Sequence, residues 1–109
     1  MKPLRVYIAG PYSKGDVVVN VREAMLAWHK LRNCGFIPFC PHLNHFLHLL
    51  IPLEYEKWLL WDLEWLAVCD ALLRLPGESP GADRECRAAK DLGIPVFDSI
   101  EAVVKYANQ

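Results

Sequence analysis

Short apolar runs alternate with longer segments of helical periodicity along the chain, and this alternation limits the fold more than any other feature. Each run has the length of a strand, and the runs cover residues 4–9, 36–39, 70–75 and 94–97. Apolar residues recur three and four positions apart in the segments that follow, which cover residues 17–32, 53–69, 80–92 and 99–107. This order predicts an α/β fold in which helices cover both faces of a parallel sheet of four or five strands.

Caps and chain breakers support these boundaries. Asp16 and Ser99 each precede a helical segment and can cap it, and Gly35 stands where the first helix should stop. Pro38 removes a backbone donor, so its strand should lie at an edge of the sheet or be irregular. In the first helix the apolar positions of helical spacing are Val18, Val21, Met25, Trp28 and Leu31.

Size and composition narrow the class of protein. The 109 residues fit one domain over residues 1–109, and the apolar fraction of 53% exceeds the usual ~45–50% of soluble domains. A net charge of −1 offers no basic surface for nucleic acid. There is no apolar run of the roughly 18 residues that a membrane span needs, and no signal peptide, so we expect a cytoplasmic protein. The four cysteines form no C-x-x-C pair, and we expect them to be reduced and mostly buried.

Three strand-to-helix loops should meet at one edge of the sheet, because right-handed crossovers bring them all to the carboxyl ends of the strands. These loops cover residues 9–16, 40–46 and 76–83. Their glycines permit close backbone approach, and helix N-termini attract anions such as phosphate or carboxylate. Neither G-x-G-x-x-G nor the Walker sequence is present, so the edge is not a standard dinucleotide or P-loop site.

Two acids are candidates for chemistry at this edge. Glu85 shares a helical face with Ala88, Ala89 and Leu92, which predicts that its carboxyl points toward the sheet. A buried carboxylate needs a partner or a catalytic role, and the structural alternative is a capping role or an ion pair with Arg74 or Arg84. Asp62 lies between Trp58 and Trp65 on an apolar helix, with a solvated outer position as its structural alternative.

Other polar residues have simpler interpretations. Asp70 opens the third strand, and we expect it to form a turn or cap at the opposite edge of the sheet. His42, His45 and His48 are spaced by three, which on a helix would give one stripe able to hold a metal. No carboxylate stands near them, so we expect no metal site. Of the three, His42 next to the strand end is the best candidate for a substrate contact, and packing or surface roles stay open.

The segments "VYIAGPYS", "DLEWLAVCDALLRLPG" and "GADRECRAAKDLGIPVF" together resemble the nucleoside 2-deoxyribosyltransferase-like superfamily, including its compact DUF4406-type branch. They occur in the family's order and span nearly the whole chain. The resemblance implies a single-domain, three-layer Rossmann-like or flavodoxin-like fold without a cofactor. It also implies cleavage of the N-glycosidic bond of a 2′-deoxynucleoside or its 5′-monophosphate, with hydrolysis or transfer to another base.

The resemblance also implies roles for particular residues. Glu85 falls on the family's nucleophile, Asp62 on the acid that binds or protonates the base, and Tyr7 on the tyrosine that contacts the nucleophile. Ser79 stands where a serine marks the monophosphate N-glycosidases, which favours a phosphorylated substrate. Substrate contacts are expected from Gly10, Pro11, Ser13, His42, Ser79 and Gly81.

The chain departs from the family at several positions. Pro11 replaces a serine that contacts phosphate, so Ser13, Lys14 and loop amides would have to make that contact. Asp83 replaces the glycine nearest the nucleophile, and residues 42–52 have no counterpart that can be aligned. The competing interpretations are a nucleotide-binding module that does no chemistry and a flavodoxin-like redox domain. The apolar helix carrying Trp58, Trp61 and Trp65 further predicts a homodimer or homotetramer.

Overall fold

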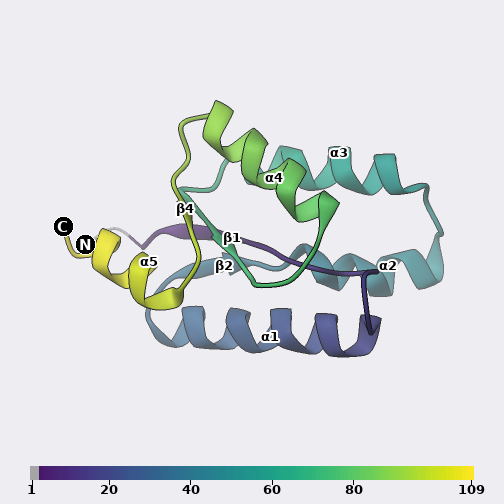
Figure 1. Ribbon diagram of the computed structural model, residues 1–109, viewed down its shortest axis with the longest axis horizontal. Helices are drawn as coiled ribbons and strands as arrows, with labels where there is room; N and C mark the ends of the chain where they lie inside the picture. Colours follow the sequence, from purple (N-terminus) through teal and green to yellow (C-terminus); the bar gives the residue numbers. More distant parts are fainter. Residues whose placement is uncertain (1–2) are drawn as a thin grey trace.

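The computed structural model describes residues 3–109 and confirms the alternating order of strands and helices (Figure 1). The elements are β1 (Arg5–Ala9), α1 (Val17–Asn33), β2 (Ile37–Phe39), the 3-10 turn η1 (Pro41–Leu43), α2 (Asn44–Leu50), α3 (Tyr55–Leu66), β3 (Ala71–Arg74), α4 (Pro80–Asp91), β4 (Val96–Phe97) and α5 (Ile100–Ala107). The segment expected as a histidine-bearing loop or short helix thus forms η1 followed by α2. The helix predicted over residues 53–69 is shorter at both ends.

The four strands form one parallel sheet in the order β2-β1-β3-β4. β2 is an edge strand, as Pro38 predicted. Tyr7 at the centre of β1 is paired in register with Phe39 on one side and Leu72 on the other. The chain moves to one side of β1 to form β2 and to the other side to form β3. Ligands of open α/β folds bind beyond the carboxyl ends of the strands at such a reversal.

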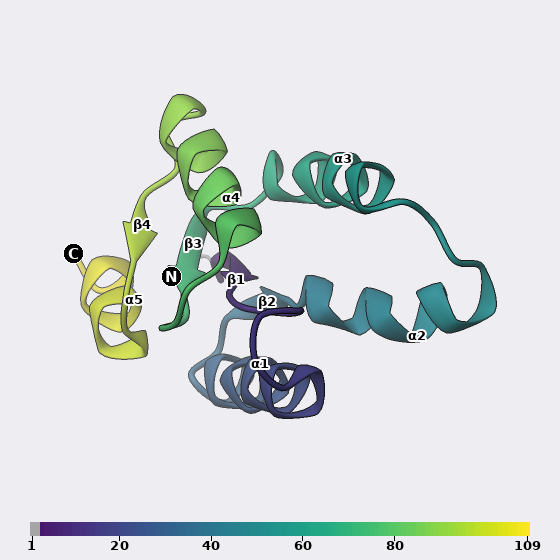
Figure 2. The same cartoon turned by 45° about the vertical axis from the view of Figure 1, so that its right-hand side comes forward.

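Helices cover both faces of the sheet (Figure 1). α1 and α5 lie on one face, where Ala24, Leu31 and Val103 pack against Val6 and Ile8. α3 and α4 lie on the other face, where Leu66, Ala82 and Ala89 pack around Tyr7 and Leu72. α2 projects beyond the sheet, and the chain turns back from it into α3 (Figure 2).

The buried face of α1 differs from the predicted stripe. Val18 and Met25 are 75% and 46% exposed, whereas the small residues Ala24 and Ala27 are buried together with Val21 and Leu31. The small side chains let α1 approach the sheet closely, and Val18 and Met25 are left at the surface.

The predicted caps are confirmed. Asp16 accepts hydrogen bonds from the amides of Val18 and Val19, and Ser99 accepts one from Ala102. Asp70 lies at the opposite edge of the sheet from the predicted site, where its carboxylate accepts a hydrogen bond of 2.8 Å from the amide of Arg5. Among residues 3–109, no helix has the length and apolar character that crossing a membrane requires.

The cysteines follow their predicted state only in part. All four are free thiols. Cys40 and Cys69 are buried, and burial raises the pKa of each thiol to about 11. Cys86 is partly buried, but Cys34 is exposed at the end of α1, so "mostly buried" holds for three of the four residues.

Candidate active site

Glu85 lies in the second turn of α4 with its carboxyl turned inward, as the helical spacing predicted. It is only 7% exposed, and its Oε2 accepts a hydrogen bond from the hydroxyl of Tyr7, which is fully buried in β1. Ser79 fixes the start of α4, since its hydroxyl accepts a hydrogen bond of 3.0 Å from the amide of Ala82. The acid is therefore held between the first turns of one helix and the central strand of the sheet.

The expected ion-pair alternative for Glu85 is wrong. Arg74 binds Asp83 at 3.1 Å, and Arg84 binds Glu56 at 2.9 Å. Both arginines therefore have other carboxylate partners at the surface. Asp83, at the position where the resemblance leads one to expect a glycine, forms this exposed ion pair with Arg74.

Asp62 is partly buried in α3, so the solvated alternative is also wrong. Its Oδ1 accepts a hydrogen bond of 2.7 Å from the side-chain amide of Asn44, the first residue of α2. Burial raises the pKa of Asp62 to about 7, although the hydrogen bond from Asn44 opposes this shift. The exposed side of α3 carries Glu64 and Trp61 instead.

A cavity of about 660 Å³ brings these acids together. This volume is in the ordinary range for small-molecule sites. The wall is formed by the loop after β1, by η1 and α2, by α3, and by the start of α4. Its residues include seven of those predicted from the sequence: Gly10, Ser13, His42, Asp62, Ser79, Gly81 and Glu85. Tyr7 lies behind Glu85 and is hydrogen-bonded to it. Pro11 is not part of the wall, but its carbonyl oxygen holds His42.

His42 is 5% exposed and lies in η1 on the cavity wall. Its Nε2 is 2.9 Å from the carbonyl oxygen of Pro11, which can only accept, so Nε2 must carry the proton. Burial lowers the pKa of His42, against the opposing effect of the Pro11 and Gly10 carbonyls, and favours the neutral ring. Within residues 3–109 its buried Nδ1 has no hydrogen-bond partner.

The other two histidines do not join His42 in a metal stripe. His45 Nδ1 is 2.6 Å from the hydroxyl of Tyr12. His48 Nδ1 accepts hydrogen bonds from the Trp58 indole at 2.9 Å and from the amide of Leu53 at 3.1 Å. In the described part of the chain, no three His, Cys, Asp or Glu residues come together in a way that could hold a metal.

The helix N-termini at this edge are less open to anions than expected. The carboxylate of Asp16 already caps α1, and Ser79 already caps α4. Ser13 and Lys14 are exposed on the loop between β1 and α1, and both line the cavity. A substrate anion would therefore meet Lys14 rather than an uncapped helix end.

Gly81 leaves room for the side chain of Tyr55 in the cavity wall. A Cβ atom at this position would lie 2.6 Å from the hydroxyl oxygen of Tyr55, which reaches over the first turn of α4. Tyr55 also lies beneath the guanidinium of Arg84, whose carbon is 6.0 Å from the ring centre.

The acids at the cavity influence each other. Burial raises the pKa of Glu85 to about 7, and the negative charge of Asp62 adds to this effect, while the Tyr7 hydrogen bond and Arg74 oppose it. Burial and then the charge of Glu85 raise the pKa of the Tyr7 phenol far above its ordinary value, so Tyr7 stays a neutral donor. Both acids titrate near pH 7, and the charge of Asp62 disfavours ionisation of Glu85, so near neutral pH one acid can be ionised while the other keeps its proton.

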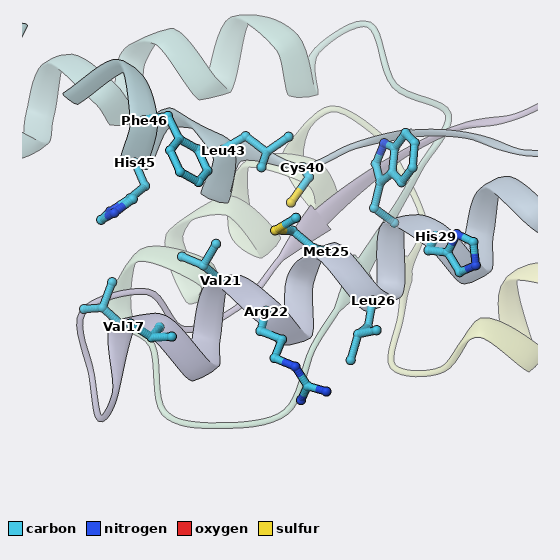
Figure 3. A pocket seen from close by; sticks show the side chains of 12 residues that line it. Val17, Val21, Arg22, Met25, Leu26, His29, Cys40, Leu43, His45 and Phe46 are labelled. Carbon is cyan, nitrogen blue, oxygen red and sulfur yellow. The ribbon is translucent and has the colours of Figure 1, made fainter. Parts of the chain in front are cut away.

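A second cavity of about 730 Å³ lies between α1 and the segment that forms η1 and α2 (Figure 3). Its wall is almost wholly apolar and includes Val21, Met25, Leu43 and Phe46. It contains no carboxylate, so it lacks the acid chemistry of the first cavity. His45 lies on both walls.

Sequence reasoning missed the contribution of α2 to the site. Asn44, His45 and His48 all line the cavity, at positions i, i+1 and i+4 of one helix face. The signal was present, because the remaining positions of α2 are apolar and leave one polar stripe on the helix. The histidines of this stripe were considered for a metal or for packing and surface roles, whereas in the structure they line the cavity together with Asn44. Tyr55 and Trp58 were missed as well: Trp58 was assigned to an oligomer interface, whereas it lines the cavity and donates a hydrogen bond to His48.

Comparison with known proteins gives a family and a fold. Residues 4–99 match the model of the family described as "Domain of unknown function (DUF7768)". Among solved structures, the chain is similar to a 2-deoxyribosyltransferase from Bacillus psychrosaccharolyticus, with a TM-score of 0.63 and 24% sequence identity over 88% of this chain and 75% of that one. No curated protein matches the chain. The predicted fold is confirmed, and the DUF4406-type resemblance stays a prediction.

Proposed function

We propose that this chain cleaves the N-glycosidic bond of a (deoxy)nucleoside or its 5′-monophosphate. The chain belongs to the DUF7768 family, and it shares the fold of a 2-deoxyribosyltransferase. One observation carries the proposal. A buried glutamate, Glu85, and a second acid with a raised pKa, Asp62, line the same cavity at the carboxyl edge of the sheet. Pairs of carboxyl groups flanking a sugar are the usual means of breaking glycosidic bonds.

In the proposed reaction, ionised Glu85 attacks C1′ of the sugar through an oxocarbenium-like transition state. The electrons of the C1′–N bond pass to the base, and protonated Asp62 gives its proton to that base. Water or the N–H group of a second base then attacks C1′ of the glycosyl ester, gives its proton to ionised Asp62 and releases Glu85 as a carboxylate. Tyr7 orients the nucleophile through its hydrogen bond to Oε2.

The similar pKa values of the two acids suit this division of roles. Attack requires Glu85 ionised, and departure of the base requires Asp62 protonated. A pair that holds one proton near neutral pH supplies both states at once, because ionisation of one acid opposes ionisation of the other. Burial lowers the pKa of His42 and favours its neutral form, which adds no positive charge to the cavity wall.

Two cationic side chains bear on whether the substrate carries a phosphate. Lys14 and Arg84 both line the cavity. Arg84 is engaged by Glu56, so Lys14 with Ser13 is the better phosphate contact in this proposal. Asp16, at the adjacent end of α1, would oppose a phosphate placed on that helix terminus.

The test is a base-release assay on 2′-deoxynucleosides and their 5′-monophosphates, with and without an acceptor base. Wild type is compared with Glu85→Gln, which keeps the size of the side chain and the acceptor for Tyr7. Release that Glu85→Gln abolishes supports the proposal, and acceptor dependence separates transfer from hydrolysis. Absence of release from every substrate, with nucleotides still raising the melting temperature, would favour the binding module instead.

The apolar surface of α2 supports a further part of the proposal, self-association. Four apolar residues of α2 and the apolar residue that follows the helix are more than half exposed. α2 carries no Lys, Arg, Asp or Glu. They are Phe46, Leu47, Leu49, Leu50 and Ile51. Homodimer interfaces are more apolar than other protein surfaces, and a twofold axis brings the same patch of both copies together. A homodimer or homotetramer is therefore expected.

A further inference from the structure

The hydrogen bond between Asn44 and Asp62 joins two walls of the cavity. Asn44 begins α2, Asp62 lies in α3, and both side chains line the space that Glu85 also faces. The amide nitrogen of Asn44 donates to Oδ1 of Asp62 at 2.7 Å. Within residues 3–109 this is the one side-chain hydrogen bond that Asn44 makes. The pair is therefore positioned as a unit at the substrate, and the mechanism above uses only its carboxyl half.

The chemistry of the pair determines what its free atoms offer to a ligand. A carboxylate only accepts hydrogen bonds, so the amide nitrogen must face Asp62 whenever that acid is ionised. The amide oxygen of Asn44 then keeps both lone pairs free as an acceptor. Oδ2 of Asp62 becomes a donor when it holds the proton. The pair thus presents a donor beside an acceptor.

We propose that Asp62 and Asn44 together recognise a 6-aminopurine, with Asp62 donating to N7 and the Asn44 oxygen accepting from the 6-amino group. This inference rests on the proposed function and specifies its base. The N7 and 6-amino positions of adenine are a matching acceptor and donor, and an asparagine oxygen is a common acceptor for that amino group. As the C1′–N9 electrons move into the ring, the Asp62 proton is transferred to N7, and adenine leaves as its neutral 7H tautomer.

A 6-oxopurine does not fit the same pair. Its O6 would face the Asn44 oxygen, and two acceptors would oppose each other in a desolvated site. Turning the amide over would bring the Asn44 oxygen against Asp62. That arrangement is favourable only if Asp62 donates its proton in a hydrogen bond to the Asn44 oxygen. The proton is then not available to protonate the leaving base. The hydrogen bond therefore links recognition of the amino group to protonation of N7.

The test compares substrates that differ only at C6 of the purine. These are 2′-deoxyadenosine against 2′-deoxyinosine, and the two 5′-monophosphates. We expect kcat/KM to favour the amino compounds by at least about 100-fold in wild type, since sites built to bond a polar group reject analogues that cannot do so. In Asn44→Ala the ratio should fall below about tenfold. Leu47→Ala, on the exposed side of the same helix, should keep the wild-type ratio.

Two results would overturn the inference: equal kcat/KM for the paired substrates in wild type, or a ratio that Asn44→Ala leaves unchanged. If wild type releases no base at all, the proposed function fails and base recognition is decided by binding. In that case adenine should raise the melting temperature of wild type more than hypoxanthine does, and Asn44→Ala should lose the difference. Equal shifts, or no shift with either base, would refute recognition as well.

Discussion

Replacing Glu85 with glutamine should stabilise the chain at alkaline pH while it abolishes base release. The pKa of Glu85 is raised from an ordinary 4.5 to about 7 by burial. Between these values the unfolded chain has lost the proton and the folded chain still holds it, so stability falls as pH rises through this window. Each tenfold change in proton affinity corresponds to about 1.4 kcal/mol, so the ionised acid costs about 3 kcal/mol above pH 7.

Glutamine resembles the protonated acid and does not titrate. Urea unfolding should therefore show Glu85→Gln more stable than wild type by about 3 kcal/mol at pH 8, and by only about 1 kcal/mol at pH 5. For a domain of this size the alkaline difference is a rise of more than about 10 °C in Tm. Glu64→Gln, at an exposed position of α3, is the matched control and should change stability by less than about 0.5 kcal/mol at both pH values. A difference that does not vary with pH, or a less stable Glu85→Gln at pH 8, would show that burial does not hold the proton on this acid.

Three other predictions test the remaining parts of the site. The pH profile of kcat/KM should be bell-shaped with its maximum near pH 7, because Glu85 must lose a proton and Asp62 must keep one. A profile that is flat from pH 5 to 9 would contradict these two protonation states. Gly81→Ala should push the Tyr55 hydroxyl aside and raise KM at least about fivefold. The Tm should stay within a few degrees of wild type, because alanine favours a helix. An unchanged KM would show that Tyr55 does not shape the cavity. Leu50→Glu on the outer face of α2 should reduce the mass in light scattering to that of a monomer, and a wild type already monomeric at micromolar concentration would end the proposal of self-association.

The elements that local sequence rules describe were predicted well. Strand and helix order followed from periodicity, and the caps at Asp16 and Ser99 followed from side chains that bond to nearby amides. The inward direction of Glu85 came from its helical spacing alone. These features depend on neighbours within a few residues, which a single sequence displays directly.

Features that depend on distant neighbours were harder to predict. The sequence pattern favoured a solvent-exposed position for Asp62. Its hydrogen-bond partner Asn44 is 18 positions away and belongs to another helix, so the pattern around Asp62 does not show it. The buried face of α1 was misplaced because Ala24 and Ala27 carry the contact with the sheet, and small residues give a weak hydrophobic signal. The ion pair between Arg74 and Asp83 likewise depends on a tertiary contact, between β3 and α4.

The hydrogen bond between Tyr7 and Glu85 joins the proposed nucleophile to the most stable part of the sheet. Tyr7 belongs to the central strand, whose amides should exchange with deuterium only when most of the fold opens. Within one subunit α2 has no buried residue, so in a monomer its amides should exchange through frequent local opening. Local opening of α2 would let a substrate pass this wall of the cavity, while Glu85 stays hydrogen-bonded to the strand whose amides exchange last.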